Sequence, residues 1–368
     1  MIRDLHTNDS PLICFVVGTT AEVVKIAPVV RLLNLRGVEF RILLTGQQGS
    51  DTWEAISQFG LNSNTIKILH TQDGISSITS AVRWFLRGLF KSLFRRREYT
   101  GLVSRNSDSV IVVHGDTLST LLGSLVAKKW GVPIAHIEAG LRSKDIFNPF
   151  PEEIIRVFVS KMSSVNYAPS ELAVDNLRGA PGEIVFTHGN TCIDTLSSLE
   201  TGTTESSLVS DYALVLLHRT EFLRNKDVFK ETVIELKKIS EHNKLMLVAD
   251  PIAMRQMSEV FHSEDQVVLL EKMDYFNFQK LVTGAKFVIT DSGGLQEECA
   301  SLGKPCLVHR RATERGDGLN ENVKLSNWES GEILLFADTF SMYARPAAGK
   351  LTSPSEIIVD DLQRKGWT

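Results

Sequence analysis

Short apolar runs followed by glycine constrain the fold of this chain more than any other feature. In the first half, such runs occupy residues 12–17, 40–44 and 109–113, and a weaker third strand is expected at 65–70. Each is too short for a helix and is typical of a parallel strand buried on both faces. Helical stretches separate the runs, beginning with an amphipathic one from about 21 to 35. The alternation predicts an α/β protein built on a doubly wound parallel sheet.

The same pattern restarts near Gly189. A chain of 368 residues, of which 43% are hydrophobic, is long enough to bury two cores. We therefore expect two domains, residues 1–189 and 190–352, each with a Rossmann-like sheet and with a cleft between them. The apolar runs of the second series occupy residues 213–217, 245–248, 267–270, 287–289 and 306–308.

A phosphate-binding turn is predicted after the run 287–289. There the sequence continues Asp-Ser-Gly-Gly, and a helical pattern then extends to Gly303. The N–H groups at a helix N-terminus and the positive end of its dipole favour an anion, and glycine allows close approach. We expect a phosphate or diphosphate at Ser292, Gly293 and Gly294. An ordinary capped turn with nothing bound remains the alternative.

Acidic side chains follow two neighbouring strands of the first half and begin the next helix. Asp116 and Glu138 come at strand carboxyl ends, and Glu152 follows Pro151 in a helical first turn. Ligands bind at the carboxyl ends of strands in open α/β sheets, where Lys25 is also expected. The joint occurrence favours a carboxylate-lined acid/base site over separate capping roles.

His218 stands at the carboxyl end of the first strand of the second domain. Its position beside a phosphate turn favours a cationic or proton-transferring role over a structural one.

A basic amphipathic helix is predicted between residues 78 and 99. Its bases recur every four residues, at Arg83, Arg87, Lys91 and Arg95. This pattern suits an anionic membrane surface or an acidic partner. The favoured interpretation is nevertheless a core-packed helix with a solvated basic face, because any surface helix needs an apolar face. The opposite apolar stripe consists of Val82, Phe85, Leu86, Leu89, Phe90, Leu93 and Phe94.

Composition excludes several classes of protein. The net charge of −4 gives no general attraction to nucleic acid. Four cysteines lack zinc-type pair spacing and indicate reduced thiols in a cytoplasmic setting, with no metal implied. There is no apolar stretch of about 18 residues and the first residues are polar, so we expect neither a transmembrane helix nor a signal peptide.

Taken as an ordered set, the motifs of this chain resemble those of the non-hydrolysing UDP-N-acetylglucosamine 2-epimerases. The resemblance implies the GT-B fold, no cofactor, a UDP-sugar substrate and a homodimer. It also implies that a last segment, residues 353–368, packs back on the first domain. The motifs are HGDT at 114–117, HIEAGLRS at 136–143, FPEE at 150–153, GNT at 189–191, DSGGLQEE at 291–298 and TER at 313–315.

The resemblance also implies a reaction. A base removes the proton at C2 of the sugar while UDP leaves C1, and UDP then adds back with the proton delivered to the other face. The acid/base groups would be drawn from Asp116, Glu138 and Glu152. His218 would help to hold the diphosphate at the turn Ser292 to Gly294. The other substrate-binding positions implied are Lys25, Arg142, Phe278, Glu298 and Arg315.

The chain also departs from the family pattern. Thr20 stands where the first loop of the family has an arginine at the diphosphate, and the segment after Gly46 begins with two glutamines. Losing a charge-assisted contact to phosphate costs on the order of 1.5–3 kcal/mol.

Three functions stay open at this point. The first is an epimerase acting on a UDP-2-acetamido sugar for surface polysaccharide. The second is a glycosyltransferase with a lipid-linked or polysaccharide acceptor, peripheral to the inner face of a membrane. The third is a catalytically silent nucleotide-sugar-binding protein. The retained carboxylates favour the epimerase.

Overall fold

The computed structural model describes residues 12–61, 66–69, 75, 77–94, 109–145, 150–200, 211–249, 251–262, 266–347 and 352–368. The chain divides into two compact units. Unit 1 comprises residues 1–195 and 352–368, and unit 2 comprises residues 196–351. The first boundary thus falls at 195, where the sequence suggested 189.

Unit 1 is built on a seven-stranded sheet in which every pairing is parallel and the order is β3-β2-β1-β4-β5-β6-β7. The chain winds outward from β1 in one direction and from β4 in the other, so the topological switch point lies between these two strands. The strands are β1 Ile13–Val17, β2 Phe40–Leu44, β3 Ile66–Ile68, β4 Val110–His114, β5 Ile134–Ile137, β6 Val165–Ala168 and β7 Glu183–Phe186.

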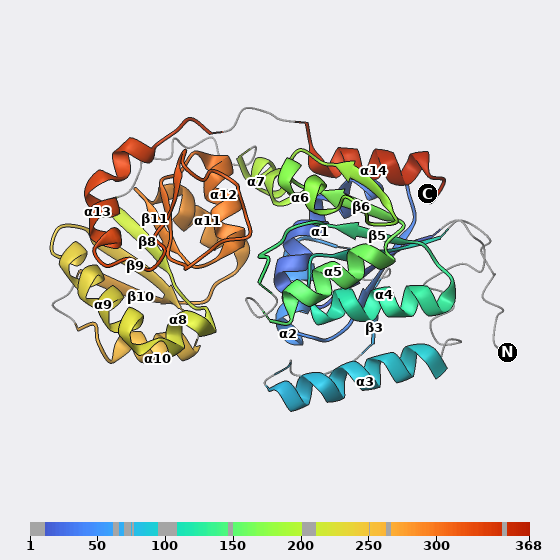
Figure 1. The fold of residues 1–368 in the computed structure, drawn as a ribbon, viewed down its shortest axis with the longest axis horizontal. Helices are drawn as coiled ribbons and strands as arrows, with labels where there is room; N and C mark the ends of the chain where they lie inside the picture. Colours follow the sequence, from blue (N-terminus) through green and yellow to red (C-terminus); the bar gives the residue numbers. More distant parts are fainter. Residues whose placement is uncertain are drawn as a thin grey trace. The chain divides into compact units, whose positions relative to one another are not determined.

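The helices of unit 1 form two packed groups. In one, α1 (Thr20–Leu35) contacts α2 (Ser50–Gln58) and α14 (Pro354–Arg364). In the other, α4 (Leu118–Trp130) lies between α3 (Ile78–Phe94) and α5 (Glu152–Met162) and contacts both (Figure 1). Right-handed crossovers place the two groups on opposite faces of the sheet. Unit 1 also contains α6 (Glu171–Asn176), and α7 (Cys192–Glu200) spans the boundary at 195.

The C-terminal helix α14 belongs to unit 1 although 156 residues of unit 2 precede it in the chain. Tyr167 donates a hydrogen bond to Asp361 at 3.0 Å, and the Ser355 N–H donates to Asp194 at 2.8 Å. These contacts close unit 1 with the end of the chain.

Unit 2 repeats the architecture with a six-stranded parallel sheet in the order β10-β9-β8-β11-β12-β13. Its switch point lies between β8 and β11. The strands are β8 Tyr212–Leu216, β9 Lys244–Ala249, β10 Val267–Glu271, β11 Val288–Thr290, β12 Cys306–Val308 and β13 Val323–Leu325. The helices are α8 Thr220–Arg224, α9 Lys226–Ser240, α10 Pro251–Ser258, α11 Tyr275–Gly284, α12 Gly293–Leu302 and α13 Glu332–Thr339, followed by the 3₁₀ helix η3 Phe340–Tyr343.

The predicted α/β class and the strands named from the sequence are confirmed within one or two residues of their ends. The third strand was expected at 65–70, but only Ile66–Ile68 is a described strand, and His70 lies outside the described residues. Strands β6, β7 and β13 were missed. The apolar signal of β6 and β13 is interrupted by Asn166 and Lys324, and β7 is only partly buried at the sheet edge.

The expected division of α3 into one apolar and one basic face holds only in part, because Phe85 and Leu89 of the apolar stripe pack against the core but other members of the stripe do not. Trp84 is buried and its Nε1–H donates to the Thr45 carbonyl at 3.1 Å. With that side packed inward, Val82, Leu86 and Phe90 are exposed beside Arg83 and Arg87. Spacing alone could not show this, because Trp84 lies among the basic positions. Residues 95–108, which include Arg95, lie outside the described residues. Among the described residues no helix is both long and apolar enough to cross a membrane.

Candidate active site

In unit 1 the candidate residues come from the turns that follow β1, β4 and β5, at the switch point of the sheet. The residue after β5, Glu138, has a positive φ of 62° although it is not glycine. Such backbone costs on the order of 1–2 kcal/mol in a residue with a Cβ and is found where function requires it. The turn therefore holds this carboxylate in a specific direction.

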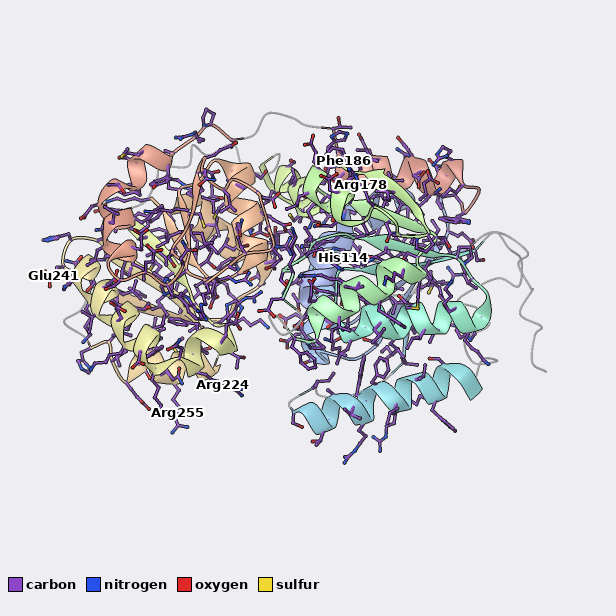
Figure 2. All side chains as sticks on the ribbon, viewed as in Figure 1. His114, Arg178, Phe186, Arg224, Glu241 and Arg255 are labelled. Atoms are coloured by element: carbon purple, nitrogen blue, oxygen red, sulfur yellow. The ribbon has the colours of Figure 1, made fainter. Side chains whose placement is uncertain are left out.

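The Glu138 carboxylate is buried within a polar cluster. It forms an ion pair with Lys25, and the Asn190 side-chain amide donates to the same oxygen. The His114 Nε2 atom lies 3.9 Å from that oxygen, and Figure 2 labels His114, the last residue of β4. Three separate segments of the chain therefore converge on one carboxylate. The pairing is required because an isolated buried charge is costly.

A second carboxylate, Asp116, follows β4 and forms an ion pair with Arg156 of α5. Arg156 also lies 3.6 Å from Glu153, and Glu153 lies 3.2 Å from Arg142. Arg142 therefore belongs to the same charged network as Asp116. Glu152 begins α5 one turn before Arg156 and so projects from the same side of the helix.

His136 holds the turn between β4 and α4 through a hydrogen bond to its backbone. Its Nε2 atom lies 2.7 Å from the Gly115 carbonyl, which can only accept, so Nε2 carries the proton. Burial lowers the pKa of His136, which keeps the ring neutral. The carbonyl next to Asp116 thus has a permanent donor.

Glu22 organises the first loop. Its carboxylate accepts hydrogen bonds from the Gly18 N–H and the Thr19 N–H, each at 2.8 Å, and from the Thr117 hydroxyl at 2.8 Å. Burial raises the pKa of Glu22 to about 7, against the opposing effect of these hydrogen bonds. One side chain therefore joins the loop after β1 to the loop that carries Asp116. The sequence suggested only a helix start here; the capping box Thr19 to Glu22 was its available signal.

Two glutamines after β2 bind the same loops. The Gln48 side-chain oxygen accepts from the Thr20 N–H at 2.8 Å, and the Gln47 oxygen accepts from the Ser119 N–H at 3.0 Å. The Thr20 hydroxyl is one of the described side-chain groups that are buried without a hydrogen-bond partner. The two departures from the family pattern, Thr20 and the glutamines, therefore meet in the structure.

In unit 2 the switch-point turns are joined by Asp291. Its buried Oδ2 atom accepts from the His218 N–H at 2.9 Å and from the Arg219 N–H at 2.8 Å. The His218 ring lies with Nδ1 3.4 Å from the other Asp291 oxygen and is partly exposed. The turns after β8 and β11 are thus one hydrogen-bonded piece, with the histidine at its surface.

The turn Ser292 to Gly294 begins α12 as predicted. The Ser292 side chain caps the helix by accepting from the Leu295 N–H at 3.4 Å, and the helix ends at Gly303 in the left-handed region. A Cβ on Gly293 would lie 2.6 Å from Arg315 Nε. Arg315 is ion-paired with Glu297 and so is fixed beside the turn. Glycine at 293 is needed for that arginine to lie so close.

Glu298 lies on the same helix, and the Tyr275 hydroxyl and the Gln279 amide donate to its two oxygens at 3.0 and 2.6 Å. Phe278 lies on α11 and is packed partly against the core of unit 2. The sequence-predicted residues therefore fall in two groups. Lys25, Asp116, Glu138, Arg142 and Glu152 belong to unit 1. His218, Phe278, Ser292, Gly293, Gly294, Glu298 and Arg315 belong to unit 2.

Sequence reasoning missed Asn190, Arg156 and Glu22 as site residues. For Arg156 a signal existed, since it lies four residues after Glu152 on the same helix. Asn190 lies in the GNT motif at 189–191, but its contact with Glu138, 52 positions earlier, is tertiary, and the motif gave no indication of it.

Two doubly wound parallel sheets, one bearing a buried carboxylate cluster and the other a capped glycine turn, define a two-domain α/β protein of the GT-B class. Similar solved structures support this. A UDP-GlcNAc 2-epimerase from Neisseria meningitidis bound to UDP-GlcNAc superposes with a TM-score of 0.81 at 26% identity, covering 96% of this chain and 99% of the other. A Methanocaldococcus jannaschii UDP-GlcNAc 2-epimerase in complex with UDP-GlcNAc and UDP gives 0.78 at 28%, with coverage of 96% and 99%.

The sequence comparisons identify the family. The profile of the UDP-N-acetylglucosamine 2-epimerase family matches residues 31–341. The UDP-N-acetylglucosamine 2-epimerase of Salmonella typhimurium is 30% identical over 343 residues, which cover 87% of each chain. The chain belongs to the UDP-N-acetylglucosamine 2-epimerase family.

Proposed function

We propose that this protein interconverts UDP-N-acetylglucosamine and UDP-N-acetylmannosamine, or a related pair of UDP-2-acetamido sugars. The observation that carries the proposal is the buried Glu138 cluster beside the Asp116–Arg156 pair at the switch point of unit 1. Acid/base chemistry at carbon needs positioned carboxylates, and here they are held by specific partners. Family membership favours this function over the glycosyltransferase alternative.

The reaction has two steps in each direction. A carboxylate removes the C2 proton, and the electron pair of that C–H bond forms the C1–C2 double bond as the C1–O bond to UDP breaks. The diphosphate oxygen then attacks C1 again, and an acid delivers a proton to the other face of C2. We assign these two proton-transfer roles to Asp116, Glu138 and Glu152 as a set. Lys25 serves by holding the charge of Glu138 in place.

The leaving diphosphate needs stabilisation by donors that do not reorganise during the reaction. We assign this to the turn Ser292, Gly293 and Gly294, whose helix N-terminus has N–H groups without intrahelical acceptors. His218 would add a cationic or proton-donating contact. Arg142 and Arg315 would contact the substrate, Glu298 the ribose, and Phe278 would adjoin the uracil.

The decisive experiment is incubation with UDP-N-acetylglucosamine in deuterated water, followed by NMR and mass spectrometry. Deuterium at C2 together with the manno epimer is the expected result. Glu138→Gln should lose this incorporation, whereas Glu171→Gln, an exposed carboxylate on α6, should keep it. Intact, undeuterated substrate with UDP still bound would contradict the proposal for this sugar.

Thr20 gives a second test of the same site. If the arginine of the family contributes to the leaving group, Thr20→Arg should raise the rate of deuterium incorporation. A Gln48→Ala variant controls for loosening the loop, since it removes the acceptor of the Thr20 N–H without adding a charge. An unchanged rate in Thr20→Arg would mean that the two glutamines already complete this loop.

We further propose a cytoplasmic homodimer that supplies a sugar nucleotide to polysaccharide synthesis. The four cysteines are free and buried, which suits a reducing setting. Sedimentation equilibrium would test the dimer.

A further inference from the structure

Asp291 has one carboxylate oxygen that is not needed to join the two switch-point turns of unit 2. Its Oδ2 atom accepts the N–H groups of His218 and Arg219, and these two bonds link the turn after β8 to the turn after β11. The other oxygen, Oδ1, is buried and accepts no hydrogen bond from the described residues. A buried acceptor costs free energy unless a donor satisfies it. The site therefore contains an oxygen in need of a donor.

The His218 ring carries the matching donor. Its Nδ1 atom is also buried without a hydrogen-bond partner among the described residues, and it lies 3.4 Å from Asp291 Oδ1. An ionised carboxylate can only accept, so the proton of the ring belongs on Nδ1. Hydrogen bonds of active sites are often long before the substrate binds. The two unsatisfied atoms therefore form one pair.

Arg219 is the other cation whose charge acts on Asp291. Its guanidinium, however, is paired with Glu221 at 3.1 Å. Burial raises the pKa of Asp291, and the charge of His218 opposes this rise more strongly than that of Arg219. The histidine is therefore the cation to which this carboxylate is matched.

The pair directs the opposite edge of the ring outwards. The His218 side chain is 39% exposed and that of Asp291 only 1%, so the exposed part of the ring is the edge that carries Nε2. Ser292 follows Asp291 directly, so one short segment places both the histidine and the turn Ser292 to Gly294. An imidazolium can donate from Nε2 to an anion while Nδ1–H remains with the carboxylate. A carboxylate holds a histidine in the same way in Ser-His-Asp sites.

We propose that Asp291 is a positioning residue, which turns Nδ1–H of His218 towards Oδ1 and stabilises the imidazolium when a nucleoside diphosphate binds at Nε2. The inference rests on the proposed function, which assigns the diphosphate to His218 and the glycine turn. A purely structural Asp291 would join the turns through Oδ2 and leave the tautomer of the ring undetermined.

Asp291→Asn separates these two roles. The asparagine oxygen can still accept the two backbone N–H groups, but the amide then donates towards Nδ1, which must become an acceptor. The shape of the side chain and the link between the turns are kept. What changes is the position of the proton on the ring.

The first measurement is the tautomer of His218, from long-range ¹H–¹⁵N correlation spectra of the full chain with ¹⁵N-labelled histidine, at a pH of about 8.5 where imidazole is neutral. His218→Gln assigns the signals. We expect Nδ1–H in the unmodified chain and Nε2–H in Asp291→Asn. An Nε2–H tautomer in the unmodified chain would overturn the proposal, and this result needs no variant of Asp291 that folds.

The matched control is Glu235→Gln. Glu235 is also a buried carboxylate of unit 2 that accepts backbone N–H groups, those of Gly331 and Ile333 at 2.9 and 3.1 Å. Its replacement weakens unit 2 in a comparable way without changing the acceptor beside His218. The His218 tautomer should be the same in this variant as in the unmodified chain; a change there would assign the effect to loosening of unit 2.

The second measurement is proton uptake on UDP binding, from calorimetry in buffers of different ionisation enthalpy at a pH of about 8. Free imidazole is mostly neutral at this pH, so formation of the imidazolium appears as protons taken up. We expect uptake by the unmodified chain. Asp291→Asn should take up fewer than half as many protons and bind UDP about tenfold more weakly. No uptake by the unmodified chain, or equal uptake by Asp291→Asn, would contradict the proposal.

A double-variant cycle tests whether Asp291 acts through the histidine. In the His218→Gln background, Asp291→Asn should cause no further loss of UDP affinity, whereas equal losses in both backgrounds would show a structural role. Deuterium incorporation tests the proposed function separately. Its absence, with the expected tautomer and uptake, would support the pair and contradict the epimerase assignment. Incorporation with uptake unchanged by Asp291→Asn would leave that assignment standing and refute the role of Asp291.

Discussion

The buried ion pair between Lys25 and Glu138 predicts a strong and asymmetric effect of substitution. The side chains are 9 and 6% exposed, so neither charge is solvated when its partner is removed. Removing one member of a buried pair costs about 3–5 kcal/mol, whereas replacing both often costs little. Lys25→Met and Glu138→Gln should each destabilise unit 1 by about that amount. The double variant should be no less stable than the worse single variant, which corresponds to a coupling energy of at least about 3 kcal/mol.

The assay is urea denaturation followed by tryptophan fluorescence. Four of the five tryptophans, Trp53, Trp84, Trp130 and Trp367, lie in unit 1. A Trp328→Phe background therefore makes the signal specific to that unit, which matters because two-domain chains rarely unfold in one step.

Stability and activity should separate in this cycle. The double variant recovers stability but not deuterium incorporation, since it lacks the carboxylate. The control pair is Arg178→Met with Asp175→Asn, an exposed ion pair of unit 1 for which we expect a coupling of about 0–1 kcal/mol. Strictly additive effects at Lys25 and Glu138, equal to those of the control, would refute the reasoning.

Three further predictions concern pH and the glycine turn. Burial lowers the pKa of His309 to about 4, so between pH 6.5 and 4 the unfolded state binds more protons than the folded state. The free energy of unfolding of unit 2 should therefore fall by about 1.4 kcal/mol per pH unit as the pH falls through that window. In chemical denaturation, His309→Gln should remove this dependence. The pKa of Glu22 in the folded state, about 7, lies above the reference value of 4.5, so the free energy of unfolding of unit 1 should fall as the pH rises from 4.5 to 7. Glu22→Gln should flatten this dependence of stability on pH. A dependence of the opposite sign would exclude a raised pKa. Gly293→Ala should displace Arg315 and so weaken UDP binding about tenfold in calorimetry. Gly294→Ala should leave the affinity for UDP nearly unchanged, because its Cβ would meet nothing nearer than 3.9 Å. Equal losses of affinity in the two variants would exclude the steric explanation.

The sequence was sufficient for most strands of the two sheets and for the turns at the switch points, because a buried parallel strand is a continuous apolar run and the residues that follow it necessarily lie at one edge. Asp116, Glu138, His218 and Ser292 could be placed in this way. The side chains that these residues contact could not be predicted from the sequence. Lys25 and Glu138 are 113 positions apart, and their contact depends on how the turns of β1 and β5 approach each other.

The helix α3 shows the other limit of sequence reasoning. Helical spacing predicted an apolar face that would pack inward, but the side that is buried includes Trp84 and leaves part of the apolar stripe exposed. Trp84 decided the orientation through its burial and its bond to Thr45. That choice requires knowledge of the surface beneath the helix, which no local pattern contains.

The left-handed backbone at Glu138 has a consequence for how this chain can change over generations. A glycine at this position would relieve the strain of the positive φ, so selection for stability alone would favour it. The same substitution, however, would leave Lys25 buried without its counter-ion. Drift towards an inactive relative is therefore opposed by a fold requirement as well as by loss of activity. A descendant that abandons the chemistry is expected to replace the lysine first or at the same time, and sequences bearing glycine at 138 should lack a lysine at 25.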